Sequence, residues 1–323
     1  MSTLTSTIFF SPSLLIPART KPTNSPNNQV FFHKNDHYLN RIVPQKKRAS
    51  FCIKAQEQKV EEGVPSATIA CPTVRPKFVL FGSSIVEYGF HEGWAATLAH
   101  LYGRQVDVVL RGYAGWNSRT ALRILDKIFP KHATQQPSLV IVYFGGNDAT
   151  HPQPDGHGSH VPLKEYSENM RKIFNHLKSL SEKTRIIFLS APPVNEAQIF
   201  GNSILLGKPL RTNESCRIYS EAGLELCHEL NIKAIDLWSA LQKRDDWRDV
   251  CFLDGIHLSA EGNKIVAKEI LKVLKEAEWE PSLHFKLMPV EFEEDSPYDP
   301  LYPDGKRTFN VSRMPFPETV EWD

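Results

Sequence analysis

Lys77-Phe78-Val79-Leu80-Phe81 is a short apolar run, and Gly82-Ser83-Ser84-Ile85 follows it directly. An apolar run of this length, bounded by turn residues, is typical of a buried strand in a parallel sheet. From Arg75 onward, similar runs alternate with longer segments of helical period. This pattern predicts an α/β domain whose parallel sheet lies between two layers of helices. The predicted strands are Lys77–Gly82, Gln105–Leu110, Ser138–Phe144, Arg185–Ser190 and Ile232–Trp238.

Two further segments carry apolar residues at the spacing of a helix that buries one face. The first, between the third and fourth strands, contains Leu163, Tyr166, Met170, Ile173, Phe174 and Leu177. The second contains Val266, Ile270, Val273 and Leu274, and the pattern stops after about Glu276. We assign both stripes to the core and give them no functional role.

The composition divides the chain into four parts. Residues 1–55 are rich in Ser, Thr, Pro and Asn, and up to residue 54 they contain eight Lys or Arg and one acidic residue. This composition resembles a plastid transit peptide, and Ile53-Lys54-Ala55 resembles a processing site, so we expect a chloroplast protein and otherwise a cytoplasmic one. The other parts are a linker at 56–74, a folded domain at 75–280 and an acidic extension at 281–323 that is rich in Pro and aromatic residues.

The charge and hydropathy patterns argue against two classes of protein. The net charge is +1, and because residues 1–54 carry the positive excess, the rest of the chain is mildly acidic. A protein that binds nucleic acid needs a basic face, so we expect no nucleic-acid partner. No apolar run approaches the roughly 20 residues that span a bilayer, so we expect no integral membrane segment.

Metal ions and disulfides are not indicated either. The cysteines form no Cys-x-x-Cys pair and are odd in number, which speaks against a zinc site and a disulfide framework; they are Cys52, Cys71, Cys216, Cys227 and Cys251. His151, His157 and His160 crowd one loop, but that loop lacks the carboxylate or cysteine spacing of a metal site. We favour a solvated or substrate-facing loop there over a metal site, and expect no metal and no cofactor.

Four polar segments follow predicted strands, and ligands of parallel α/β sheets gather outside the carboxyl ends of the strands. The segments are Phe81–Ile85, Arg111–Asn117, Tyr143–Asp148 and Asp254–Ser259. This is the edge of the sheet at which we look for chemistry.

Together these segments supply what acyl transfer from a serine needs: a hydroxyl at a turn, an imidazole base, a carboxylate that orients the base, and donors for the oxyanion. Asp254 and His257 lie three residues apart in a turn, so the carboxylate can reach the ring nitrogen that faces away from the serine. Gly115 and Gly146 have no side chain to block a backbone N–H, and Asn147 offers a neutral amide donor.

Each part alone has a simpler interpretation. A Gly-Ser-Ser after a strand is usually a plain turn, and an Asp-x-x-His is usually a capped helix start, for which Ser259 would be the cap. The hypothesis of a catalytic site therefore depends on the joint placement of these residues at successive strand ends.

At these residues the sequence resembles the SGNH hydrolases, also called the GDSL esterase/lipase family, and looks most like plant members of the isoamyl acetate-hydrolysing esterase group. The resemblance covers roughly Arg75 to Glu276. It implies a three-layer, flavodoxin-like fold with a five-stranded parallel sheet between helices.

The resemblance also implies a role for each site residue. Ser84 would be the nucleophile, with Asp254 and His257 completing a catalytic triad. The oxyanion hole would consist of the backbone N–H groups of Ser84 and Gly115 and the side chain of Asn147.

One residue departs from the family pattern, because Ser83 stands where the family has an acid directly before the nucleophile. Two adjacent serines leave a formal ambiguity, but the spacing from Gly82 favours Ser84. We interpret the missing carboxylate as a support of the turn rather than a participant in proton transfer.

We therefore expect a cofactor-independent serine esterase that hydrolyses small or short-acyl carboxylic esters through an acyl-enzyme. One alternative is an O-deacetylase that acts on carbohydrate or phenolic esters at the same site. The other is a catalytically silent ligand-binding protein in which Ser83 disables the site. Loops 149–162 and 195–212, which would build the substrate pockets, have no readable periodicity, so the sequence does not name the ester. It does not indicate the oligomeric state either.

Overall fold

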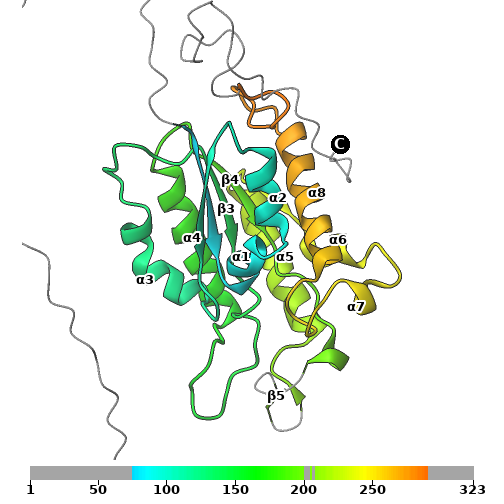
Figure 1. Ribbon diagram of the computed structural model, residues 1–323. Helices are drawn as coiled ribbons and strands as arrows, with labels where there is room; N and C mark the ends of the chain where they lie inside the picture. The colour runs from blue at the N-terminus through cyan, green and yellow to red at the C-terminus, as the bar shows by residue number, and fades with distance from the viewer. Residues whose placement is uncertain (1–74, 200–203, 206–207, 290–323) are drawn as a thin grey trace, which may run out of the picture. The chain divides into compact units, whose positions relative to one another are not determined.

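The computed structural model describes residues 75–199, 204–205 and 208–289. A five-stranded parallel sheet lies between two layers of helices, which confirms the predicted three-layer α/β architecture (Figure 1). The sheet order is β2-β1-β3-β4-β7, the flavodoxin-like order. Its strands are β1 Lys77–Gly82, β2 Asp107–Gly112, β3 Leu139–Tyr143, β4 Arg185–Leu189 and β7 Lys233–Ile235.

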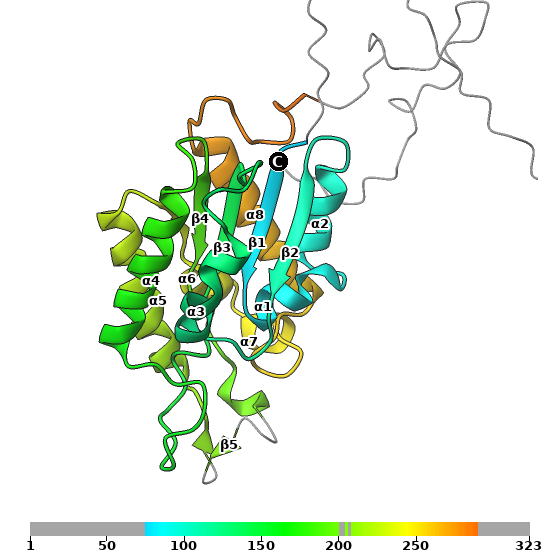
Figure 2. The same cartoon turned by 90° about the vertical axis from the view of Figure 1, so that its left-hand side faces the viewer.

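Helices cover both faces of this sheet (Figures 1 and 2). One layer consists of α3 Ser118–Ile128, α4 Leu163–Lys178 and α5 Asn213–Glu229. The other consists of α1 Ser84–Glu87, α2 Trp94–Leu101, α6 Leu237–Gln242, α7 Trp247–Val250 and α8 Ala260–Glu276. Two short turns and a small hairpin complete the described elements: η1 Tyr88–Phe90, η2 Glu196–Gln198, β5 Ile204–Leu205 and β6 Lys208–Pro209.

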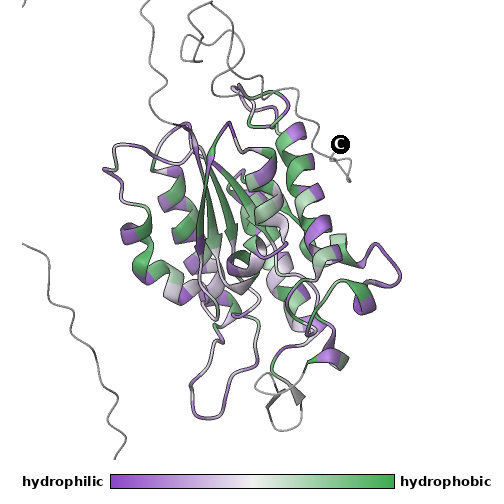
Figure 3. Ribbon diagram, viewed as in Figure 1, coloured by the Kyte–Doolittle hydropathy of each residue, from purple (hydrophilic) through white to green (hydrophobic). Residues whose placement is uncertain are grey.

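The sheet is apolar on both faces, as the unbroken apolar run of β1 predicts. Phe78 and Leu80 point into one cluster of buried side chains, with α2, α6 and α8, whereas Val79 and Phe81 point into the other, with α3, α4 and α5. Successive strand residues face opposite sides, so burial of both faces requires a continuous apolar run. Figure 3 shows the strands as a hydrophobic centre between helices of mixed hydropathy.

The last predicted strand, Ile232–Trp238, is wrong in its second half. Only Lys233–Ile235 forms β7, because the Asp236 side chain accepts a hydrogen bond from Ser239 N (3.0 Å) and caps α6. The apolar residues after Asp236 therefore begin a helix, and a short apolar run does not distinguish a strand end from a buried helix start.

The second strand also begins later than the predicted Gln105–Leu110. The backbone N–H groups of Gln105 and Val106 donate to Tyr102 O and close the turn after α2, so they cannot enter the sheet. The ladder starts where Asp107 pairs with Lys77. The third predicted strand is one residue longer than β3 at each end, and the fourth is one residue longer than β4 at its C-terminal end. Differences of this size are ordinary at element boundaries.

Both predicted helical stripes are confirmed, with one exception at a helix end. Leu163, the first residue of α4, is 37% exposed, whereas the other stripe residues of α4 are fully buried. In α8 the stripe packs against the sheet, with Val273 partly buried. The helix begins at Ala260 after Ser259, whose side chain accepts from Gly262 N (3.3 Å), as predicted.

Part of the predicted C-terminal extension is hydrogen-bonded to the turn that follows α2. Tyr102 Oη donates to Leu283 O (2.8 Å), and Gln105 Nε2 donates to Phe285 O (2.7 Å) and Met288 O (3.0 Å). The transit-peptide-like segment, the linker at 56–74 and residues 290–323 lie outside the described residues. In the described part of the chain, none of the helices has the length and apolar character needed to cross a membrane.

The register of the sheet aligns the carboxyl ends of its strands. Gly82 pairs with both Gly112 and Tyr143, and Tyr143 pairs with Leu189. The segments that leave β1, β2 and β3 therefore emerge side by side at one edge, where the sequence predicts the site.

Candidate active site

Ser84 occupies the first turn after β1. The Ser83 carbonyl accepts from the backbone N–H groups of Val86 (3.0 Å) and Glu87 (2.9 Å), so α1 starts without an intervening loop. A Cβ at Gly82 would lie 2.5 Å from Val86 Cγ2 and 2.6 Å from Tyr143 O. The sharp turn therefore requires glycine before the two serines, and it holds Ser84 at the edge of the sheet.

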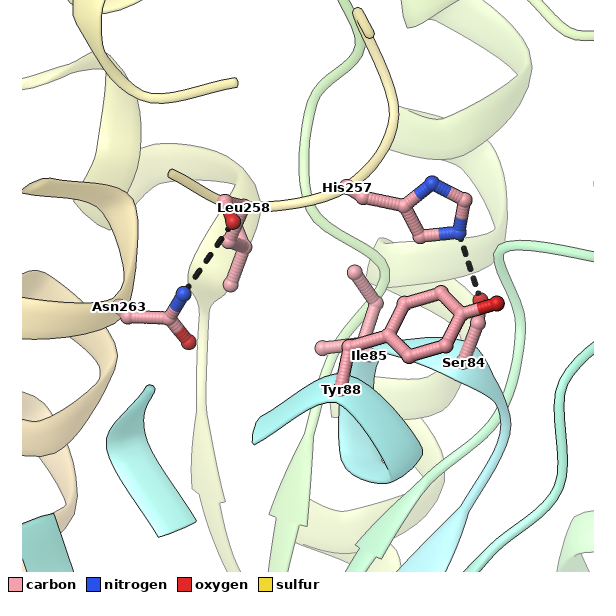
Figure 4. Close-up of a pocket in the computed structure, with 6 residues that line it drawn as sticks. All are labelled: Ser84, Ile85, Tyr88, His257, Leu258 and Asn263. Atoms are coloured by element: carbon pink, nitrogen blue, oxygen red, sulfur yellow. Dashed lines mark hydrogen bonds between the residues drawn. The ribbon is translucent and has the colours of Figure 1, made fainter. Parts of the chain in front are cut away.

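The structure brings Ser84, His257 and Asp254 together in a hydrogen-bonded chain. His257 Nε2 lies 3.0 Å from Ser84 Oγ, as Figure 4 shows, and His257 Nδ1 lies 2.7 Å from Asp254 Oδ2. The two contacts use opposite ring nitrogens, as the three-residue spacing predicts. A carboxylate at Nδ1 favours the tautomer with its proton there, which leaves Nε2 free to accept a proton from the serine.

Asp254 is held as an anion by its own turn. Its Oδ1 accepts from the backbone N–H groups of Ile256 (2.9 Å) and His257 (2.8 Å). Burial alone would raise the pKa of Asp254, but the hydrogen bonds from the His257 backbone and ring and from Ile256 outweigh it and leave the pKa below its ordinary value.

The turn that carries Asp254 and His257 has its own backbone requirement. Gly255 has φ +85°, a left-handed conformation, and a Cβ there would lie 2.4 Å from Asn195 O. The segment is closed by a bridge between Phe252 and Leu258. Glycine at this position thus allows the carboxylate and the ring to face each other.

The two adjacent serines differ in their surroundings. Ser84 Oγ contacts the imidazole, whereas Ser83 is 3% exposed at the N-terminal cap of α1. The geometry therefore agrees with the spacing argument, which favours Ser84.

Gly115 and Asn147 are the other two predicted site residues. They are linked through the backbone of Trp116. Gly115 has φ +78°, and no atom lies within 4 Å of the position that its Cβ would take. Asn147 Nδ2 donates to Trp116 O (2.7 Å), the carbonyl of the residue after Gly115. The loop that carries Gly115 is also held by α1, because Ala114 N donates to Glu87 Oε2 (2.5 Å).

Two residues at the site were missed from the sequence, Asp148 and Arg211. Asp148 is fully buried, its Oδ1 accepts from Ser118 N (2.9 Å), and burial raises its pKa to about 6. Arg211 Nη2 donates to Asn147 Oδ1 (2.8 Å). One sequence signal could have placed Arg211. Thr212 and Ser215 form a capping box, which predicts that α5 starts there and that Arg211 is the last residue before the helix cap.

A small hollow adjoins Ser84 and His257 (Figure 4). Its volume is about 180 Å³ including the part open to solvent, and its lining residues are Ser84, Ile85, Tyr88, His257, Leu258 and Asn263. The Tyr88 ring stands edge-on to the imidazole with 5.1 Å between ring centres. The wall beside Ser84 and His257 is thus mostly apolar and aromatic.

The loop that carries His151, His157 and His160 has a histidine ring in contact with the backbone. His160 Nδ1 lies 2.5 Å from Thr150 O, and across the described residues no group of three or more His, Cys, Asp or Glu side chains is arranged to hold a metal ion. Cys216, Cys227 and Cys251 are buried free thiols, and the other two cysteines lie outside the described residues.

Comparison with known proteins identifies relatives of this chain. The sequence matches the GDSL-like Lipase/Acylhydrolase family over residues 80–265. It is 60% identical over 251 residues to the GDSL esterase/lipase WDL1 of Oryza sativa subsp. japonica, which covers 77% of this chain and 96% of that protein. It is 58% identical over 251 residues to the GDSL esterase/lipase CPRD49 of Arabidopsis thaliana, and the alignment covers 77% of this chain and 98% of that protein.

A more distant relative comes from an animal. The isoamyl acetate-hydrolyzing esterase 1 homolog of Rattus norvegicus is 36% identical over 195 residues, which cover 59% of this chain and 78% of that protein. These similarities confirm the family resemblance that the site motifs predict.

Proposed function

Because this chain belongs to the GDSL-like lipase/acylhydrolase family and is a carboxylic ester hydrolase, we propose that Ser84, His257 and Asp254 are its catalytic triad. The observation that carries the proposal is the 3.0 Å contact between Ser84 Oγ and His257 Nε2. An imidazole nitrogen at hydrogen-bond distance can take the hydroxyl proton as the oxygen attacks an ester carbonyl.

The first half-reaction forms an acyl-enzyme. Ser84 Oγ bonds to the carbonyl carbon while its proton moves to His257 Nε2. His257 then gives this proton to the alcohol oxygen as the ester C–O bond breaks. Asp254, ionised and 2.7 Å from Nδ1, stabilises the imidazolium between these two steps.

The second half-reaction releases the acid. A water molecule gives a proton to His257 Nε2 and its oxygen bonds to the acyl carbon. The bond to Ser84 Oγ then breaks, the proton returns to that oxygen, and the carboxylic acid leaves. Neither half-reaction calls for a cofactor.

The oxyanion of both steps would be stabilised by the backbone N–H groups of Ser84 and Gly115 and by Asn147 Nδ2. The hydrogen bond from Asn147 to Trp116 O supports this assignment because it ties the amide to the Gly115 loop. Donors that are fixed before the reaction stabilise developing charge without reorganisation.

The hollow beside the triad favours small substituents. It occupies about 180 Å³ even when its part open to solvent is included. Ile85, Tyr88 and Leu258 give it apolar walls that suit a short apolar group. We therefore propose small or short-acyl esters as substrates.

Hydrolysis of p-nitrophenyl esters with graded acyl length tests the proposal. The wild type should act best on the shortest acyl groups. Ser84→Ala should lose on the order of 10⁶ in kcat, the size found when a triad serine is removed elsewhere, while Ser83→Ala should keep much of the activity. Equal loss in both serine variants would mean that the triad is misassigned, and a wild type without turnover on any ester would favour the silent ligand-binding alternative.

A further inference from the structure

The carboxamide of Asn147 is held between two partners of opposite hydrogen-bonding character. Its Oδ1 accepts from Arg211 Nη2 at 2.8 Å, and its Nδ2 donates to Trp116 O at 2.7 Å. Asn147 itself is 8% exposed, so few other partners can reach it.

These two partners fix which way the amide faces. A guanidinium has only donors and a backbone carbonyl has only acceptors. Rotating the amide of Asn147 by 180° would turn its N–H groups toward Arg211 and its oxygen toward Trp116 O, and both contacts would become repulsive. In the observed orientation Trp116 O takes one of the two N–H groups of Nδ2. The other N–H remains available for an oxygen of the substrate.

The backbone around Arg211 is anchored on both sides. Before it, Leu210 O accepts from His151 N (2.6 Å), and after it, Thr212 Oγ1 accepts from Ser215 N (3.0 Å) in the capping box of α5. The guanidinium also lies close to Gly146, whose Cβ would be 3.3 Å from Arg211 Nη1. The same Cβ would meet Tyr143 Oη first, at 2.4 Å, so glycine at 146 makes room for that hydroxyl and leaves the guanidinium beside it.

The contacts of Arg211 do not resemble those of a stabilising ion pair. Its Nε is buried and has no hydrogen-bond partner among the described residues, and a buried donor in this state destabilises the fold. In the described part of the chain, its guanidinium donates to the neutral amide of Asn147. A role at the site explains why a charged side chain is kept there.

We propose that Arg211 is a positioning residue that locks the Asn147 amide with an N–H toward the oxyanion. The inference rests on the proposed function, since it assumes that Asn147 is an oxyanion donor. Without Arg211 only Trp116 O opposes the flipped amide, so the orientation with the oxygen toward the developing negative charge becomes more populated. The loss would be felt in the transition state more than in the bound substrate, so kcat should fall and KM should stay nearly unchanged.

Replacing Arg211 tests the proposal. Arg211→Met keeps much of the length and removes every donor, and should lower kcat by about 10- to 100-fold, less than or equal to the loss of a whole oxyanion donor. Arg211→Lys keeps a donor and should recover much of this loss. Arg217→Met is the matched control, because Arg217 lies on α5 and pairs with exposed Glu214 and Glu221, and its kcat should equal that of the wild type.

A double-mutant cycle separates positioning from any independent effect of Arg211. In an Asn147→Ala background, Arg211→Met should change kcat by less than about 2-fold, because no amide is left to orient. An equal loss of kcat in both backgrounds, an unchanged kcat in Arg211→Met, or a rise in KM alone would each overturn the proposal. If Asn147→Ala itself keeps the wild-type kcat, the oxyanion-hole assignment fails first, and that single variant reveals it.

Discussion

Asp148 stands next to a proposed oxyanion donor and is a buried carboxylic acid. Burial is the largest influence on it and raises its pKa to about 6, while hydrogen bonds from Ser118 act in the opposite direction. Its Oδ2 has no hydrogen-bond partner among the described residues. A carboxyl in such surroundings favours its neutral form.

The raised pKa of Asp148 predicts a pH-dependent stability. Between about pH 4 and pH 6 the folded chain keeps the Asp148 proton and the unfolded chain has lost it, so the free energy of unfolding falls as the pH rises through this window. The change in the free energy of unfolding is on the order of 3 kcal/mol. Asp148→Asn keeps an acceptor for Ser118 N and removes the ionisation.

Chemical unfolding of both proteins from pH 4 to pH 7 measures this effect. The stability of the wild type relative to Asp148→Asn should decrease from pH 4 to pH 6 and stay constant above. A difference that is the same at every pH would show that Asp148 titrates normally in the fold.

At the residue scale, the sequence predicts contacts within one segment better than contacts between segments. Asp254 and His257 are three residues apart, so their pairing follows from turn geometry alone. Arg211 and Asn147 are separated by 64 positions, and their contact depends on how the segment before α5 packs against the end of β3. Spacing carries no information about such a contact.

At the scale of elements, the close packing of α1 on β2 holds Ser84, the proposed nucleophile, and the Gly115 loop together. A Cβ at Gly112 would lie 2.2 Å from Glu87 N and 2.5 Å from Glu87 Cα. Both atoms are backbone, so no side-chain movement can relieve the overlap.

Gly112→Ala should therefore destabilise the fold by about 1–3 kcal/mol, the cost of overpacking, and should lower kcat because Ser84 begins the displaced helix. Gly103→Ala is the control, since a Cβ there would have its nearest neighbour at 3.4 Å and the residue is exposed, and it should change stability by less than about 0.5 kcal/mol. Thermal melting and ester turnover check both variants. A Gly112→Ala protein as stable as Gly103→Ala would contradict the packing argument.

Two strands illustrate where the prediction of secondary structure from the sequence succeeds and where it fails. β1 was predicted at its observed bounds because both of its faces are buried and a glycine turn ends it. β7 was predicted too long because Asp236, a residue that also occurs in loops, acts as a helix cap there. Whether a cap residue begins a helix is decided by the packing of the residues after it.

At the scale of the whole molecule, the segment before the described domain remains a prediction from composition. We propose that residues 1–55 direct import into plastids and that the domain at 75–280 folds without them, because they carry nearly all of the positive excess and lack core periodicity. A fluorescent protein fused to residues 1–55 should enter plastids. Fluorescence that stays in the cytosol or enters the secretory pathway would contradict this localisation.

We propose that one serine, Ser84, is activated by His257, whose Nε2 lies 3.0 Å from its Oγ. The most direct measurement is covalent labelling with a fluorophosphonate, followed by mass-spectrometric mapping of the modified residue, because the reagent reports an activated serine whatever the natural ester is. The wild type and Ser83→Ala should be labelled on Ser84, and Ser84→Ala and His257→Ala should not be labelled. A label on Ser83, or an unlabelled wild type, would contradict the account.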